Sequence, residues 1–229
     1  SFWVGCSGAK CSIIKVQQEG IAVVRVLIVD DQSLVQTYLR TVVEENPDCS
    51  VVGTLDCADA AVARCTAGGV DLVLMDVCTA EDASGLTAAA KIKQACPRVK
   101  IIVVTSMPEV SFIEKAKAAS CESFWYKMAP RRELEQVLAA TIAGERMYPL
   151  DRPTVYIGNA NSVEFTDKEL CILRELIEGN SQNEIADKYG VTRSAVKYHI
   201  RNMLQKTGYD SYVKLVIDVV DKRLIIPNY

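Results

Sequence analysis

The chain has 229 residues, of which 49% are hydrophobic and 24% charged, with a formal net charge of -3. This composition argues against a disordered chain, and at roughly 100–200 residues per domain the length favours two domains. No apolar run approaches the roughly 20 residues of a membrane-spanning helix, so we expect no membrane partner.

Cysteine usage points to a reduced protein. The chain has nine cysteines, an odd number, and it is longer than the small secreted domains that depend on disulfides. Cys6 and Cys11 are close in sequence, but His199 is the only histidine and no second pair completes a zinc site. We therefore expect a cytoplasmic protein without a structural zinc ion.

The N-terminal segment differs from the rest of the chain. Lys10 and Lys15 interrupt its apolar residues, whereas a signal peptide needs an uninterrupted apolar stretch after its basic start. We expect residues 1–20 to be a leader of unknown role.

Short apolar runs alternate with amphipathic segments over residues 21–145. Each run lacks the alternation of a half-buried strand and suits a buried parallel strand. Strands are expected at 23–29, 51–54, 72–75, 101–104 and 123–126, and helices at 32–45, 58–67, 85–95, 111–119 and 132–143. Strands that alternate with helices predict a doubly wound α/β domain, with a five-stranded parallel sheet covered by helices on both faces.

The strand pattern ends after this domain. Residues 146–162 are rich in proline, glycine and asparagine and predict a linker. Residues 163–229 predict an all-α domain whose first two helices begin with capping boxes, at Thr166 and Ser181. A short helix ending at Tyr189, a glycine turn and a longer helix over 192–206 form a helix-turn-helix pattern.

Polar residues lie where the predicted strands of the α/β domain end. They are Asp30, Asp31, Asp76, Thr105 and Lys127. Ligands bind at the carboxyl ends of parallel strands, and three carboxylates converging there favour a hard divalent cation, which we expect to be Mg²⁺. Asp76 would then attack phosphorus while Lys127 and the cation balance the oxygen charge. A single strand-end Asp is usually an ordinary turn former, but the five residues together favour a phosphoryl-transfer site.

Four features of this domain carry a family resemblance: the Asp-Asp pair, the strand ending in Asp76, Val-Val-Thr-Ser and Phe-Trp-Tyr-Lys. Through them the chain resembles the receiver domain of two-component response regulators over roughly residues 24–145. The resemblance implies a flavodoxin-like fold and a sensor histidine kinase as partner. The roles it implies are phosphoacceptor for Asp76, metal site for Asp30 and Asp31 with Asp76, switch hydroxyl for Thr105, phosphate-pairing lysine for Lys127 and switch aromatic for Phe124.

The segment after Asp76 departs from the receiver pattern. It lacks the usual proline and is one residue longer before Gly85-Leu86, and Glu81 and Asp82 add negative charge near the pocket. We expect an altered lifetime of the phosphoryl group, with the chemistry intact.

Positive charge in the C-terminal domain is segregated onto its third helix. Residues 164–229 hold ten basic and ten acidic residues, yet the segment from Thr192 to Lys206 contains no acid and four basic residues, Arg193, Lys197, Arg201 and Lys206. An isolated basic helix is more often only a solvated face, but a basic helix after a tight turn suits the major groove of DNA.

This domain resembles the LuxR-type output domain of the NarL/FixJ family. The residues that carry the likeness are Thr166, Glu169, Leu173, Asn183-Glu184-Ile185-Ala186, Val196-Lys197, His199, Met203 and Lys206. The resemblance implies that Lys197, Tyr198 and Arg201 face bases, that Arg193 meets phosphate and that His199 is packed.

The last helix has an apolar stripe whose role stays open between a dimer face and core packing. The stripe consists of Tyr212, Leu215, Val216 and Val219.

These features together predict a DNA-binding transcriptional regulator, rather than an enzyme, that is switched by phosphorylation of Asp76 and is a homodimer when active. One alternative is a constitutive DNA-binding regulator whose receiver is never phosphorylated. Another is a Mg²⁺-dependent phosphatase or phosphotransferase with an Asp nucleophile, although Asp76-Val77-Cys78 lacks the second acid of such enzymes. A cysteine-based redox sensor is the remaining alternative.

Overall fold

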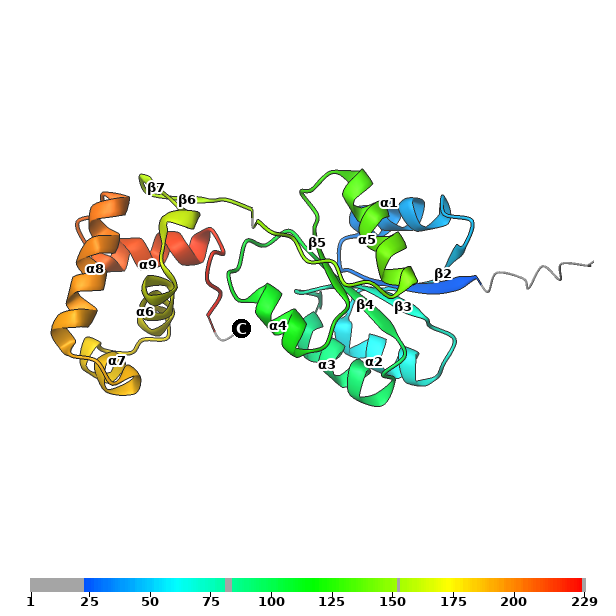
Figure 1. Cartoon of the computed structure of the whole chain (residues 1–229), viewed down its shortest axis with the longest axis horizontal. Helices are drawn as coiled ribbons and strands as arrows, with labels where there is room; N and C mark the ends of the chain where they lie inside the picture. The colour runs from blue at the N-terminus through cyan, green and yellow to red at the C-terminus, as the bar shows by residue number, and fades with distance from the viewer. Residues whose placement is uncertain (1–22, 81–83, 152, 228–229) are drawn as a thin grey trace, which may run out of the picture.

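The computed structural model describes residues 23–80, 84–151 and 153–227, which form an α/β domain followed by a helical domain (Figure 1). Among these described residues, no helix is both long enough and apolar enough to cross a membrane. The predicted leader, 1–20, lies outside them.

The α/β domain contains one parallel sheet of five strands. The strands are β1 (Val24–Val29), β2 (Cys49–Leu55), β3 (Leu72–Asp76), β4 (Lys100–Thr105) and β5 (Ser123–Tyr126). Their order is β2-β1-β3-β4-β5, and every neighbouring pair is parallel. The order reverses beside β1 and β3, so the ends of these two strands form the switch point at which such sheets bind ligands.

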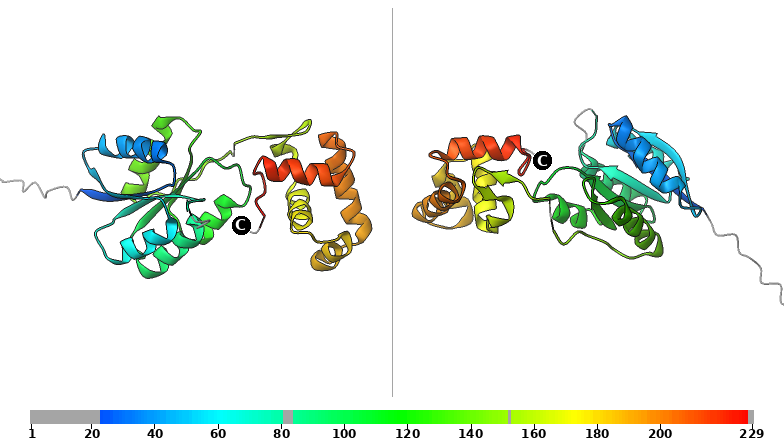
Figure 2. Two further views of the ribbon diagram at one scale, coloured as in Figure 1. Left: turned by 180° about the vertical axis from the view of Figure 1, so that it is seen from behind. Right: turned by 90° about the horizontal axis from the view of Figure 1, so that it is seen from above.

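Five helices cover the sheet, as the alternating pattern predicts. They are α1 (Ser33–Glu44), α2 (Ala58–Thr66), α3 (Gly85–Ala95), α4 (Phe112–Ala118) and α5 (Arg131–Ala143). Helices α1 and α5 lie on one face, and α2, α3 and α4 lie on the other (Figures 1 and 2). Two apolar cores result, one on each face, with Leu39 and Leu134 in the first and Ile92 and Phe112 in the second. The predicted doubly wound fold is confirmed.

The helical domain begins with a small hairpin. Its elements are β6 (Tyr156–Ile157), β7 (Ala160–Asn161), the 3-10 helix η2 (Ser162–Glu164), α6 (Asp167–Ile177), α7 (Gln182–Tyr189), α8 (Arg193–Thr207) and α9 (Tyr212–Asp221). The hairpin lies in residues 146–162, which the sequence predicts to be a linker. Ile157 and Ala160 are buried in the core of the helices, so this part of the segment packs as part of the domain.

Local capping explains why the helices of this domain begin and end where they do. Thr166 and Ser181 form capping boxes with Glu169 and Glu184, as predicted. Gly190, at φ 63°, ends α7 in the left-handed conformation that glycine adopts without strain, and α8 starts three residues later. The helix-turn-helix is therefore formed by α7 and α8.

The apolar residues of α9 divide between two faces. Leu215 and Val219 are fully buried in the domain core, so they belong to packing and not to a free dimer face. Val213 and Ile217, one helical turn apart, are 50% and 62% exposed. The two most exposed apolar residues of α9, Val213 and Ile217, therefore do not belong to the stripe that the sequence predicts.

Candidate functional site

Three carboxylates meet at the carboxyl edge of the sheet. Asp30 follows β1 and is fully buried, Asp76 ends β3 and is 5% exposed, and Asp31 is exposed to solvent. One carboxylate oxygen from each lies within 4.8 Å of the other two. Because β1 and β3 are paired neighbours, their ends bring these residues together. An all-oxygen set with one solvent-facing ligand fits a hard divalent cation such as Mg²⁺.

Lys127 supplies a positive charge to this cluster from the end of β5. Its Nζ lies 2.6 Å from Oδ2 of Asp30 and 3.0 Å from Oδ2 of Asp76. Burial raises the pKa of Asp76 to about 6, and Asp30 adds to the rise, while Lys127 opposes it. The lysine therefore does not balance the carboxylates fully, and a bound cation would complete the compensation of charge.

Thr105 lies beside the cluster at the end of β4, and Phe124 is the second residue of β5. Val104 pairs with Asp76 across the sheet, so Thr105 is the following residue at the same edge. Its buried hydroxyl accepts a hydrogen bond from the amide of Met107 at 3.2 Å. Phe124 is buried and packs edge-on against Tyr126, with the ring centres 4.9 Å apart. All five residues predicted at the strand ends thus lie at this edge of the sheet.

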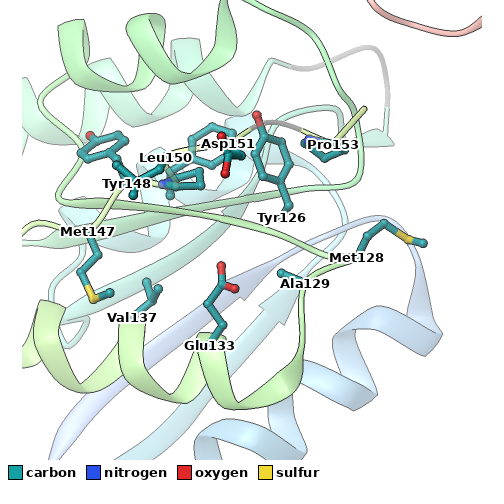
Figure 3. A pocket seen from close by; sticks show the side chains of 12 residues that line it. Tyr126, Met128, Ala129, Glu133, Val137, Met147, Tyr148, Leu150, Asp151 and Pro153 are labelled. Carbon is teal, nitrogen blue, oxygen red and sulfur yellow. The ribbon is translucent and has the colours of Figure 1, made fainter. Parts of the chain in front are cut away.

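A pocket of about 500 Å³ lies on the outer side of β5. It is bounded by β5, α5 and the segment that leaves the α/β domain, and Phe124 is among its lining residues (Figure 3). Val137 and Glu133 point into it from α5, opposite Tyr148. The amide of Phe124 also donates to the carbonyl of Met147 at 2.8 Å, so the start of the interdomain segment is hydrogen-bonded to β5, the strand of the predicted switch aromatic.

The segment after Asp76 is anchored to its surroundings. The hydroxyl of Thr79 accepts from the amide of Ala58 at 2.9 Å and so caps the start of α2, and Thr79 is buried. Gly85 packs so closely that a Cβ on it would lie 1.8 Å from the carbonyl oxygen of Asp76. Glu81 and Asp82, predicted to add charge here, lie outside the described residues. Thr79 could not be singled out from the sequence, because its partner Ala58 is 21 positions away.

The basic helix α8 presents its predicted DNA-contacting residues to solvent. Arg193, Lys197, Tyr198 and Arg201 are all exposed, with Tyr198 at 60%. Helix α8 lies on the side of the helical domain away from the α/β domain (Figures 1 and 2). Lys206 differs from the other cations, because its Nζ lies 2.7 Å from the buried carboxylate of Glu169.

A buried acid holds α6 against α7. Glu175 of α6 is 3% exposed and accepts from Lys188 at 2.6 Å, Asn180 at 2.7 Å and Tyr189 at 2.9 Å. Burial opposes ionisation, but these hydrogen bonds outweigh it and lower the pKa of Glu175. The cluster fixes the first helix of the helix-turn-helix and was missed from the sequence, because its members resemble ordinary surface residues.

Known protein families match both domains. Residues 26–139 match the response regulator receiver domain, and residues 163–219 match the luxR family of bacterial regulatory proteins. The response regulator protein VraR of Staphylococcus aureus is 28% identical over 210 residues, which cover 88% of this chain and 99% of VraR.

Solved structures agree with the fold. An RcsB–DNA complex has a TM-score of 0.60 at 22% identity and covers 86% of this chain and 97% of its own. RcsB of Salmonella enterica serovar Typhimurium, bound to a promoter with a phosphomimetic, has a TM-score of 0.58 at 21% identity, covering 86% and 98%. At these identities the likeness extends to the fold alone. Together with the two family matches, the acidic edge and the exposed basic helix identify this chain as a DNA-binding response regulator with a receiver domain and a LuxR-type helix-turn-helix domain.

Proposed function

We propose that Asp76 accepts a phosphoryl group from a partner histidine kinase and that this modification controls binding of DNA by α8. The observation that carries the proposal is the contact of buried Asp76 with Lys127 and its convergence with Asp30 and Asp31 at one edge of the sheet. The likeness to receiver domains supports the same assignment.

The residues of the site divide the chemistry between them. A carboxylate oxygen of Asp76 forms a bond to phosphorus as the bond from phosphorus to the kinase histidine breaks. Lys127, already 3.0 Å from Asp76, pairs with a phosphoryl oxygen. Mg²⁺, held by Asp30, Asp31 and Asp76, would neutralise charge on the other oxygens.

The phosphoryl group then changes the balance between two conformations. It adds about 1.5 to 2 negative charges, and the hydroxyl of Thr105 can donate to it by moving toward Asp76. Phe124 lies on the adjacent strand and follows this movement. Conversion of a mostly inactive population to a mostly active one requires about 5.5 kcal/mol of differential stabilisation.

DNA binding is assigned to the exposed side of α8. Lys197, Tyr198 and Arg201 face the bases in the major groove, and Arg193 meets phosphate. One solved structure of RcsB contains two dimers bound to two parallel DNAs. We extend pairing of this kind to the active form of this chain, which places two α8 helices on one operator, in the cytoplasm.

The test of phosphorylation compares wild type with Asp76→Asn. Bound DNA sequences are first selected from a random pool, and affinity for them is measured with and without beryllofluoride and Mg²⁺. We expect beryllofluoride to raise the affinity of wild type at least tenfold and to leave Asp76→Asn unchanged. Equal affinities in all four cases would support the constitutive regulator instead, which the altered segment after Asp76 also favours.

The test of the DNA interface uses salt. A dimer that places the three exposed cations of α8, Arg193, Lys197 and Arg201, against the DNA in each subunit should give a slope of log K against log salt of about -5. Arg201→Ala should weaken binding strongly, whereas Lys91→Ala, an exposed cation on α3 of the other domain, should leave both affinity and slope unchanged. A wild-type slope near zero would exclude the basic helix as the interface.

A further inference from the structure

The pocket on the outer side of β5 has two acidic side chains and no basic one among its described lining residues. Glu133 lines it from α5, and Asp151 lines it from the interdomain segment (Figure 3). Glu133 is half-buried, and neither carboxylate forms an ion pair with another described residue. By contrast, Glu135, two residues further along α5, pairs with Arg131 at 2.8 Å. The pocket therefore carries negative charge that its own wall does not compensate.

Three aromatic rings line the same pocket. Phe124 and Tyr126 belong to β5, and Tyr148 belongs to the interdomain segment. Nζ of Lys117, which is not a lining residue, lies 5.4 Å from the centre of the Tyr148 ring, so this ring already attracts one cation. A cation is drawn to the negative face of an aromatic ring, and the attraction is stronger where water is excluded. The rings and the two carboxylates therefore favour the same kind of occupant, a positively charged one.

The size of the pocket suits a small organic molecule. Its volume of about 500 Å³ lies within the range of roughly 300–1,000 Å³ that is usual for ligand sites. Val137 and Met147 add apolar surface to its wall. A divalent metal ion needs several oxygen ligands close together, and among the described residues such a group is formed at the acidic edge of the sheet and not by Glu133 and Asp151. The occupant that fits is an organic cation with an apolar body.

Hydrogen bonds hold the interdomain segment in place as one wall of the pocket. The amide of Met147 donates to the hydroxyl of Ser123 at 3.1 Å, and its carbonyl accepts from the amide of Phe124. The hydroxyl of Tyr148 donates to the carbonyl of Cys121 at 2.7 Å. The pocket is thus preformed, as ligand sites usually are. A molecule bound in it would contact β5, α5 and the segment together and would oppose local opening of the segment.

We propose that this pocket binds a small organic cation, in which an ammonium group is attached to an apolar body. The ammonium group pairs with the carboxylates of Glu133 and Asp151, and the apolar body packs against the three aromatic rings. Binding ties the interdomain segment more firmly to the receiver. The inference does not rest on phosphorylation of Asp76, since none of the residues at the acidic edge of the sheet lines the pocket.

Methionine methyl groups report binding at the pocket. The probe is benzyltrimethylammonium, which joins a quaternary ammonium group to an aromatic ring, and it is added to the full-length protein labelled with carbon-13 at its methionine methyls. Met147 lines the pocket, whereas Met203 is buried in the core of the helical domain and serves as the internal reference. Phenylacetate, an aromatic ligand of similar size and opposite charge, is the control.

We expect the probe to shift the methyl resonance of Met147 with a dissociation constant of about 5 mM or lower, which is ordinary for a ligand of its size, and to leave Met203 unchanged. Phenylacetate should bind at least tenfold more weakly, because its carboxylate is repelled by Glu133 and Asp151. Equal dissociation constants for the two ligands would overturn the cation site. So would an unshifted Met147 at about ten times the expected dissociation constant.

Two variants test the carboxylates directly. Glu133→Gln and Asp151→Asn remove one charge each and keep the shape of the side chain, so each should raise the dissociation constant of the probe at least tenfold. The matched control is Glu135→Gln, which removes the same charge from a side chain of α5 that does not line the pocket and should change the constant less than twofold. Unchanged methyl resonances of Met75 and Met203 verify that both domains stay folded. Wild-type affinity in both Glu133→Gln and Asp151→Asn would overturn the proposal.

Hydrogen exchange tests the effect on the interdomain segment. We expect saturation with the probe to slow exchange of the Met147 amide at least threefold in wild type and to leave it unchanged in Glu133→Gln. Binding without slower exchange would show that the ligand does not hold the segment, and would overturn a site formed by β5, α5 and the segment together.

Discussion

Replacement of Asp76 by asparagine should stabilise the metal-free protein, although it alters a buried and hydrogen-bonded residue. Burial raises the pKa of Asp76 from 3.8 to about 6, so the folded protein holds this proton more tightly than the unfolded chain. The ionised carboxylate therefore costs free energy of folding above pH 6. A rise of this size corresponds to about 3 kcal/mol. Asparagine is neutral and keeps an oxygen for the amide of Val77, which donates at 2.8 Å.

The sign of this effect fixes its dependence on pH. The cost is absent below about pH 4, where both states are protonated, and it develops as pH rises to about 6. Urea unfolding of wild type and Asp76→Asn, in chelator at pH 4 and pH 8, measures the difference. Asp71→Asn, at the other end of β3, is the control with the opposite sign, because the hydrogen bond from Arg25 lowers the pKa of Asp71. An Asp76→Asn protein less stable than wild type at pH 8 would refute the reasoning.

Three further predictions concern close packing, a buried ion pair and the metal site. Gly85→Ala should lower the free energy of unfolding by more than about 2 kcal/mol in a urea titration, because its Cβ would collide with the carbonyl of Asp76. Lys206→Met leaves the buried Glu169 without its cation and should cost about 2 kcal/mol, while the salt slope of DNA binding stays the same. Mg²⁺ should raise the melting temperature of wild type at pH 8, and Asp31→Asn, which loses an exposed ligand, should reduce this rise without lowering the melting temperature in chelator.

The sequence predicts the α/β fold well because each of its signals is local. Apolar runs such as Leu72 to Met75 mark buried strands wherever they pair, and the alternation with helices dictates a parallel sheet. The hairpin around Ile157 and Ala160 could not be found in this way. Each of its strands has two residues, which is too short for a periodic pattern, and only contact with the helical core stabilises them.

The acidic edge could be predicted because a strand end fixes where a side chain lies, whatever the rest of the chain does. Residues that act across long sequence distances could not. Glu109 looks like an acid in a loop, but its partners Arg174 and Ile226 are 65 and 117 positions away. Glu175 likewise looks in the sequence like an exposed acid on a helix surface. It becomes a buried hydrogen-bond acceptor only when α7 packs against α6.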